Sequence, residues 1–173
     1  LKKESILAHC IHLSPKNFSQ IHTTKSWLVH NPRSNMNNNV GYAPIHLFGN
    51  RAVLGTDGFP ADMLEEARTG FFKSREQGAG SGEQRAKSKE QIPLTTDLLS
   101  NGNKLVSEIF NEKFGMFEKN SIADFVVLNY NAPTPMTKEN LPYHFLFGMS
   151  SANVESVMCN GKFIVWNREL IGV

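Results

Sequence analysis

The sequence Ala-Val-Leu-Gly-Thr-Asp-Gly at residues 52–58 places a carboxylate directly after an apolar run. The run predicts a buried strand over residues 51–56, with Asp57 following it. A carboxylate at the end of a strand can be held rigidly over a pocket, and its oxygens are good ligands for zinc or iron. The spacing is equally compatible with Asp57 capping a helix that begins near Ala61.

Two earlier apolar runs, residues 5–10 and 26–30, also predict strands, and polar side chains mark their ends: His9 in the first, His30 and Asn31 in the second. Helical segments alternate with these strands, which predicts parallel βα units. In βα barrels the carboxyl ends of the strands form the active-site face. A complete barrel needs about 250 residues, so three strands can be only part of one.

Turn residues and hydrophobic periodicity predict the structure of the segments between and after these strands. A helix is predicted over residues 16–22, a loop rich in turn formers over 33–41 and a short helix over 43–48. A further helix begins after Pro60, and its apolar stripe consists of Met63, Leu64, Ala67, Phe71 and Phe72.

The second half of the chain changes character. Residues 74–91 predict a flexible linker, and a helix covers about 93–112. Beyond Gly115, strand-like runs occur at residues 125–128, 154–159 and 163–166, and Asn160-Gly161 is a strong signal for a two-residue hairpin turn. We therefore expect two domains, residues 1–113 and 114–173, the second being a small β unit.

Composition narrows the possible partners. The 173 residues carry 18 basic and 16 acidic side chains, a net charge of +2 that predicts neither nucleic-acid nor membrane binding. Cys10 and Cys159 have the spacing of neither a disulfide framework nor a metal-ligand pair, and no apolar run has membrane-spanning length. We expect a cytoplasmic protein. The chain starts at Leu1 with a pattern typical of the middle of a fold, so we expect further sequence upstream.

The histidines allow more than one interpretation. His9 and His12 lie three residues apart, and on a strand such residues face opposite sides, so both cannot bind one metal. One of them is therefore assigned to a site and the other to structure. A single histidine on a strand is more often a hydrogen-bonded core residue than a ligand. The same applies to His30, whose ring could simply orient the turn at Asn31.

Five motifs together resemble the amidohydrolase superfamily: they lie at residues 7–13, 30–36, 54–58, 123–128 and 157–162. The resemblance is to the branch that holds guanine deaminase, methylthioadenosine/S-adenosylhomocysteine deaminase and the triazine hydrolases. The segment Asn-Pro-Arg-Ser-Asn-Met-Asn-Asn at residues 31–38 is similar to that of the SsnA-type aminohydrolases in this branch.

The resemblance implies the carboxyl-terminal part of a metal-dependent (β/α)8 barrel, from about the sixth to the eighth strand, followed by part of a small β-sandwich. In that family the residue matching His9 is catalytic and hydrogen-bonds the reacting water or substrate. The residue matching Asp57 binds the metal and shuttles protons. We expect one divalent ion, zinc or iron. Asn35 and Phe59 are the local candidates for substrate binding.

The function implied is hydrolysis of a carbon–nitrogen or similar bond in an N-heterocyclic small molecule. The chain departs from the family by lacking its His-x-His and His-x-x-Glu motifs, which supply the other metal ligands and the catalytic glutamate. We therefore expect the isolated chain to be inactive unless a missing N-terminal half or a second chain, such as a homo-oligomer partner, supplies them. Two alternatives stay open: a non-catalytic fragment or subunit, and opening of a cyclic amide as in imidazolonepropionase.

Overall fold

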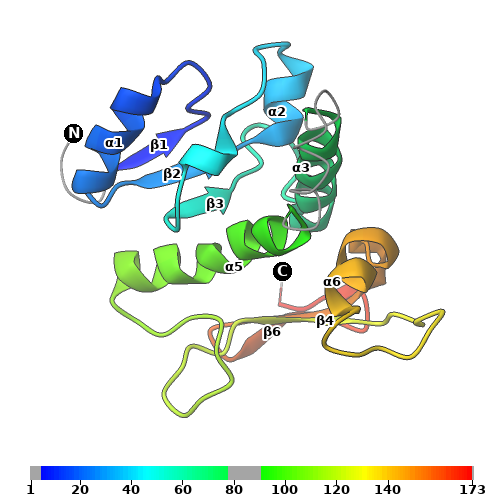
Figure 1. The fold of residues 1–173 in the computed structure, drawn as a ribbon. Helices are drawn as coiled ribbons and strands as arrows, with labels where there is room; N and C mark the ends of the chain where they lie inside the picture. Colours follow the sequence, from blue (N-terminus) through cyan, green and yellow to red (C-terminus); the bar gives the residue numbers. More distant parts are fainter. Residues whose placement is uncertain (1–4, 78–90, 173) are drawn as a thin grey trace. The chain divides into compact units, whose positions relative to one another are not determined.

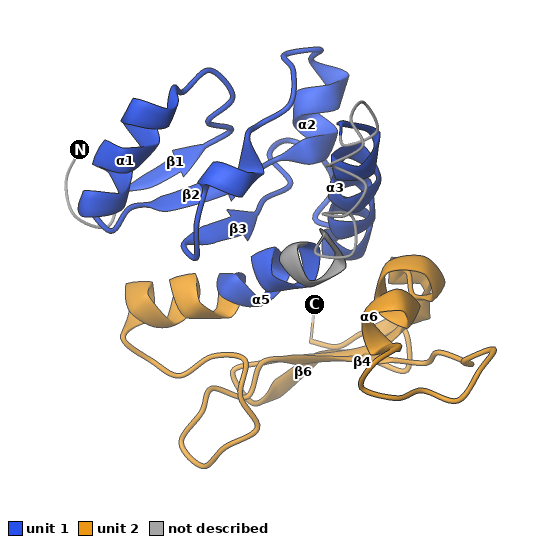
Figure 2. Cartoon of the chain, in the orientation of Figure 1, with its two compact units in different colours: residues 1–102 blue, residues 103–173 orange. Residues whose placement is uncertain are grey.

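The computed structural model describes residues 5–77 and 91–172. The chain divides into two compact units, residues 1–102 and 103–173 (Figure 2). This division falls inside the helix α5 (Gln91–Phe110). The division into compact units does not test the predicted domain boundary after residue 113, which stays a prediction.

Unit 1 contains a parallel sheet of three strands, β1 (Ile6–Ala8), β2 (Trp27–His30) and β3 (Ala52–Leu54), in the order β1-β2-β3 (Figure 1). Leu7 pairs with Leu28 in β2, and Val29 pairs with Val53 in β3. The parallel arrangement and the strand order along the chain are as the sequence predicts. Every residue of β3 is buried, which is typical of a strand covered on both faces.

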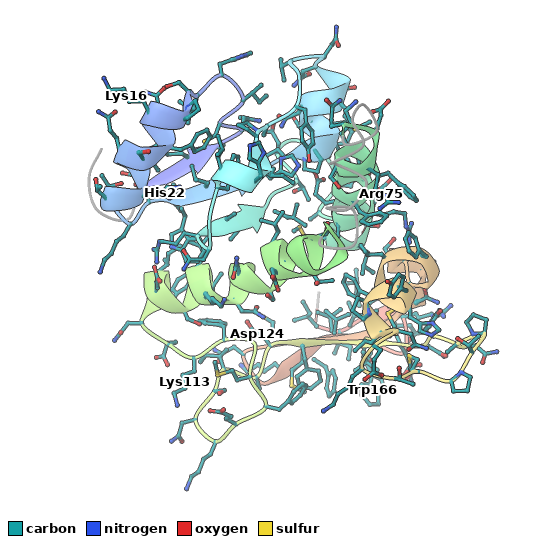
Figure 3. All side chains as sticks on the ribbon, viewed as in Figure 1. Lys16, His22, Arg75, Lys113, Asp124 and Trp166 are labelled. Carbon is teal, nitrogen blue, oxygen red and sulfur yellow. The ribbon has the colours of Figure 1, made fainter. Side chains whose placement is uncertain are left out.

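Helix α1 (Pro15–Thr23) begins where the sequence places it. The Ser14 side chain accepts a hydrogen bond from the Asn17 amide, and the Asn17 side chain accepts one from the Ser14 amide, so the two satisfy free donors at the helix start. Phe18 is buried against Phe48, which directly follows the short helix η1 (Ile45–Leu47). His22, labelled on α1 in Figure 3, hydrogen-bonds the Leu47 carbonyl at 2.9 Å. These contacts tie α1 to the η1 segment.

The loop predicted at residues 33–41 is wrong in its first part, because residues Pro32–Asn37 form helix α2. Asparagine and serine favour turns and helix ends over helix interiors, and a helix of six residues is too short to show an apolar period. Pro32 occupies the first turn, where its missing amide hydrogen costs nothing. Asn39 follows the helix with φ of 51° and ends it in the left-handed conformation.

Helix α3 (Met63–Gln77) buries only part of its predicted stripe. Ala67 and Phe71 are buried, whereas Phe72 is 54% exposed and the acidic Glu66 is fully buried. Of the predicted linker, residues 74–77 belong to α3, and 78–90 lie outside the described residues. Helix α5 corresponds to the helical segment predicted at about residues 93–112. Its Asn101 side-chain amide donates to the Ala52 carbonyl of β3 at 2.9 Å.

Unit 2 contains an antiparallel sheet in the order β4-β5-β6-β7, formed by Phe125–Leu128, Val154–Cys159, Lys162–Trp166 and Glu169–Leu170. The first three strands and the β5–β6 hairpin confirm the sequence prediction. Asn160 and Gly161 have φ of 47° and 75°, the two left-handed residues that such a hairpin turn requires.

Three short helices, α6 (Leu141–Tyr143), η3 (His144–Gly148) and η4 (Ser151–Asn153), precede β5. Among residues 5–77 and 91–172, no helix combines the length and the hydrophobicity needed to cross a lipid bilayer.

Candidate functional site

The carboxyl ends of β1 and β3 bring His9 and Asp57 together. Because the strands of this sheet are parallel, their carboxyl ends meet at one edge. Both residues have left-handed backbones, with φ of 66° at His9 and 53° at Asp57. Such conformations are uncommon outside glycine, and at strand ends they mark sharp changes of chain direction. The His9 amide still donates to the Val29 carbonyl at 2.9 Å, so the turn begins directly at the sheet edge.

The imidazole of His9 faces the carboxylate of Asp57. Nε2 of His9 lies 3.7 Å from Oδ2 of Asp57, and the two side chains are 40% and 43% exposed. This separation is longer than a hydrogen bond but short enough for an electrostatic interaction. Strand-end position made both residues candidates, and the family resemblance assigned His9 and Asp57 to the site. His12, the alternative in the His-x-x-His pattern, is exposed.

Two consecutive residues of α2 hold this pair. The Ser34 hydroxyl donates to Oδ2 of Asp57 at 2.6 Å, and Nδ1 of His9 donates to Oδ1 of Asn35 at 2.8 Å. The direction of the second bond follows from chemistry, because an amide oxygen only accepts hydrogen bonds. Both α2 side chains are buried. Sequence reasoning missed Ser34 altogether and assigned Asn35 to the substrate.

The helix-capping role considered for Asp57 belongs to Asp62. Oδ1 of Asp62 accepts the Glu65 amide at 2.9 Å, and its carbonyl accepts the Glu66 amide at 3.0 Å. Asp62 therefore satisfies the first turn of α3. The carboxylate of Asp57 is left for other interactions.

A buried ion pair connects α2 to α3 beside this edge. Arg33 is 8% exposed and Glu66 fully buried, and Nε of Arg33 donates to Oε2 of Glu66 while the Arg33 amide donates to Oε1 at 3.0 Å. The remaining guanidinium donors reach the Glu65 carboxylate at 3.0 Å and the Pro60 carbonyl at 2.8 Å. Removing one partner of such a pair leaves an uncompensated buried charge, which is strongly destabilising. The network therefore fixes α2 and the chain just after Asp57.

An open hollow of about 310 Å³ adjoins Asp57. It is lined by α2 and by the segment after β3, through Ser34, Asn37, Asn38, Asp57, Gly58, Phe59 and Pro60. Phe59 thus lies where a bound molecule could touch it, and Arg33 covers its ring at 5.4 Å from the centroid. Asn35 is 2% exposed and contacts His9. Substrate binding by Phe59 and Asn35 stays a prediction.

Gly55 permits the close approach of β3 to the turn after β2. A β-carbon at this position would lie 2.6 Å from Cγ1 of Val29 and 2.8 Å from Nδ2 of Asn31, closer than packed atoms can approach. The Gly55 amide also donates to the His30 carbonyl at 3.0 Å. A side chain here would push the Asp57 turn away from its neighbours.

His30 is a buried core residue that does not reach the exposed edge. It is 1% exposed, and its ring packs edge-on against Tyr42 and Phe48 at centroid distances of 5.8 and 6.4 Å. Among the described residues neither ring nitrogen has a hydrogen-bond partner. Burial lowers the pKa of His30 from 6.5 to about 4, because the charged form is poorly solvated there. The ring is therefore neutral at physiological pH.

Asp57 offers a fitting ligand for a metal ion at this edge. Within residues 5–77 and 91–172 there is no group of three or more histidine, cysteine, aspartate or glutamate side chains placed to share a metal. The carboxylate of Asp57 lines the hollow and is partly exposed, and in the described part of the chain its Oδ1 has no hydrogen-bond partner. A carboxylate oxygen of this kind is suited to zinc.

Comparisons with known proteins give a consistent result. The chain is 27% identical over 175 residues to a 5-methylthioadenosine/S-adenosylhomocysteine deaminase of Desulfitobacterium hafniense, covering 97% of this chain and 38% of the relative. The solved structure of an adenosine deaminase from Xanthomonas campestris with bound zinc superposes with a TM-score of 0.70 at 19% identity, over 97% of this chain and 38% of that one. Atrazine chlorohydrolase from Arthrobacter aurescens, complexed with zinc, gives 0.67 at 15% identity, over 97% and 37%.

The two structural likenesses concern the fold. The chain spans less than half the length of the curated relative and of both solved structures. A family model, that of the amidohydrolase family, matches residues 1–164 and so covers nearly the whole sequence. The chain belongs to the amidohydrolase family.

Proposed function

We propose that this chain is part of a metal-dependent hydrolase of the aminohydrolase or deaminase type, acting on a carbon–nitrogen or similar bond of an N-heterocyclic small molecule. The observation that carries the proposal is the meeting of His9 and Asp57, 3.7 Å apart, at the carboxyl edge of a parallel sheet in a chain of this family. In the complete protein, β1, β2 and β3 would be about the sixth to eighth strands of a (β/α)8 barrel. Unit 2 would be part of a β-sandwich.

Asp57 is the residue of this chain that would hold the metal, which we propose to be zinc or, as the alternative, iron. Its exposed carboxylate beside the hollow and its unpartnered Oδ1 among the described residues support this role. The chemistry that a divalent metal supplies here is the activation of water at neutral pH, because coordination lowers the pKa of water.

The chain's own residues would move the protons. The Asp57 carboxylate accepts a proton from the attacking water and returns it to the leaving nitrogen. His9 faces the same carboxylate with Nε2, so its ring can hydrogen-bond the reacting water. Water adds to the electron-poor ring carbon, the carbon–nitrogen bond breaks, and ammonia leaves. Phe59 would form an apolar wall beside the substrate ring.

The substrate class is proposed from similar proteins whose names state adenosine, a methylthioadenosine and atrazine as substrates. All three are nitrogen heterocycles carrying a substituent that water can displace. The relatives include both deaminases and a chlorohydrolase. We propose ammonia as the leaving group, with halide as the alternative. An assay that measures both ammonia and chloride separates the two. The SsnA-like branch assignment stays a prediction.

The other metal ligands would come from outside this chain, from an N-terminal half of the same protein or from a second chain such as a homo-oligomer partner. The chain's 38% coverage of its curated relative supports this. A single carboxylate holds a catalytic metal poorly against water, since catalytic zinc sites use three protein ligands. The isolated 173 residues should therefore be inactive.

The experiment is a screen of the full-length protein for ammonia and chloride release from adenosine derivatives, guanine and chlorinated aminotriazines, together with metal analysis. We expect one tightly bound divalent ion, turnover of one such compound, and loss of turnover on chelation that zinc restores. A matched preparation of the isolated chain serves as the control. Turnover that persists after complete metal removal would contradict the proposal.

The second candidate is a non-catalytic subunit that acts through its folding partner. The lack of a three-residue ligand group in the described part of the chain favours it. The same metal analysis separates the two, because a full-length protein without bound metal and without turnover on any of these compounds would support the non-catalytic subunit.

A further inference from the structure

We propose that helix α2 is a positioning element for the candidate site, with Ser34 orienting Asp57 and Asn35 orienting His9. The inference deepens the proposed function and rests on it for the catalytic roles of the two partners. Ser34 and Asn35 are positioning residues in this proposal, because each acts through the reacting group that it touches.

The order of the strands explains how one helix serves both residues. The middle strand β2 is followed directly by α2, whereas His9 and Asp57 follow the outer strands β1 and β3. Consecutive residues on an α-helix point about 100° apart, since the helix has 3.6 residues per turn. Neighbouring side chains at the end of the middle strand can therefore reach toward opposite sides. Ser34 reaches the β3 side and Asn35 the β1 side.

Ser34 controls which oxygen of Asp57 is free. Its hydroxyl has one proton, which goes to Oδ2 of Asp57 at 2.6 Å. The side-chain amide of Asn38, one turn further along, donates to the Ser34 oxygen at 3.4 Å and favours this direction. A hydrogen bond to a carboxylate is stronger than one between neutral groups and fixes its rotation. Oδ1 of Asp57 then remains available for a ligand beside the hollow.

Asn35 controls how the ring of His9 is presented. Its Oδ1 can only accept a hydrogen bond, so the neutral ring carries its proton on Nδ1 and offers the lone pair of Nε2. That Nε2 is the atom that faces Asp57. Asn35 is 2% exposed, and its backbone N–H donates to the Asn31 backbone carbonyl at 2.9 Å. The residue is therefore held through both its backbone and its side chain.

The helix itself is anchored by the residue before this pair. Arg33 binds the fully buried Glu66 through its backbone amide and its guanidinium group. The attachment to α3 prevents α2 from sliding or rotating, which a short helix could otherwise do. A small shift of α2 would move both hydrogen bonds at once.

The two halves of the proposal predict different losses in the full-length protein. Ser34→Ala should weaken zinc affinity about 10- to 100-fold, the usual cost of removing a hydrogen bond to a metal ligand, and Ser34→Thr should restore much of it. Asn35→Leu should leave zinc affinity unchanged and lower kcat about 10- to 100-fold at full zinc occupancy with little change in KM. Asn35→Asp keeps an accepting oxygen and should recover part of this loss.

Two controls separate positioning from general destabilisation. Ser19→Ala removes a hydroxyl on α1 that donates to the Pro15 carbonyl at 3.2 Å. Asn101→Leu removes a buried amide that bonds the Ala52 carbonyl. Asn101→Leu should lower the thermal midpoint, yet neither control should alter zinc affinity or kcat. If Asn101→Leu reproduced the kinetic loss of Asn35→Leu, the positioning role of Asn35 would be refuted.

If the unsubstituted protein bound no zinc, the proposed function would fail. Two measurements would still test the positioning roles of Ser34 and Asn35 in that case. The first is the imidazole nitrogen signal of His9 in NMR spectra, assigned with His9→Gln and recorded well above the ordinary histidine pKa. It should report the Nδ1–H tautomer and become a mixture in Asn35→Leu. The second is the Asp57 carboxylate in a crystal structure of Ser34→Ala, which should be rotated. An unchanged His9 signal together with an unmoved carboxylate would overturn the inference.

Discussion

Asp57 and Asp124 are both aspartates at strand ends, one in each unit, and they differ in what surrounds them. Asp57 follows the carboxyl end of β3, is 43% exposed, and meets Ser34 and His9. Asp124, labelled in Figure 3, precedes β4, and its Oδ1 accepts the backbone amide of Asn160 at 2.5 Å. Each carboxylate is exposed and lines a hollow of its own unit. The first meets side chains from α2 and from the end of β1, whereas the second accepts a hydrogen bond from a hairpin turn.

The type of sheet explains this difference. In the parallel sheet of unit 1 the carboxyl ends of all three strands meet at one edge, so polar residues from distant segments gather there. In the antiparallel sheet of unit 2 a turn lies at each end, and a polar side chain satisfies the backbone of that turn. Burial agrees, since β3 is buried throughout while β6 alternates between exposed and partly buried residues.

The largest difference between the two units should appear when each aspartate is replaced by alanine. In the full-length protein, Asp57→Ala should abolish metal retention and lower turnover by at least about 10²- to 10⁴-fold, the contribution of a positioned proton-transfer group. Asp124→Ala should cost about 1 kcal/mol of stability for one lost hydrogen bond and leave turnover unchanged. Metal analysis and steady-state kinetics check both. Normal metal content in Asp57→Ala would refute the ligand assignment.

Replacing one glutamate in each unit should also give very different losses of folding stability. Glu66→Ala leaves Arg33 buried without its partner and should destabilise the protein by about 3–5 kcal/mol. Glu118, 60% exposed and 4.0 Å from Lys113, forms a surface pair whose loss should have almost no effect. Thermal unfolding of the two alanine variants measures this. Equal midpoints would show that the Arg33 network does not anchor α2.

The buried histidines of the two units differ in their hydrogen bonding, and this difference should affect how stability depends on pH. His144 in unit 2 is bonded to Tyr130 at 2.9 Å and to Thr134 at 3.2 Å, whereas neither nitrogen of His30 has a partner in the described residues. The folded-state pKa of His30 is lowered to about 4, so from pH 6.5 down to about 4 the unfolded chain takes up a proton that the folded chain does not. Stability should therefore fall by about 3 kcal/mol across this window as pH decreases.

The check is the thermal midpoint measured between about pH 4 and 7. His30→Leu should flatten the decline regardless of its own stability at neutral pH. His46→Leu, at an exposed position, is the matched control and should keep the slope. A slope that survives in His30→Leu would assign the acid sensitivity to other groups.

The smallest effect is expected at the hairpin of unit 2. Gly161→Ala places a β-carbon at φ of 75° and should cost about 1–2 kcal/mol. Turnover should be unaffected, because this turn connects β5 to β6 and bonds Ala123 and Asp124 of its own unit. Denaturant unfolding and kinetics on the same sample test both statements. A loss of turnover without a loss of stability would give this turn a role that its geometry does not suggest.

Prediction from sequence worked where local pattern and structure coincide. The strands β1 to β6 lie within or close to their predicted ranges, and the Asn160-Gly161 turn needed no tertiary information, because its two left-handed residues are encoded locally. Prediction failed at α2, whose six residues carry no apolar period. The predicted apolar stripe of α3 also leaves out Glu66, which is fully buried because Arg33 compensates its charge inside the fold.

Apolar runs and turn residues act within a few positions of one another, so they specify the order of the strands and the placement of His9 and Asp57 at their ends. Tertiary structure alone decided that Ser34 holds Asp57, that Asn35 holds His9 and that Asp62 caps α3 in place of Asp57. The Ser34–Asp57 and His9–Asn35 hydrogen bonds join residues 23 and 26 positions apart in the sequence. They exist because a parallel sheet gathers its strand ends at one edge, which no local pattern can specify.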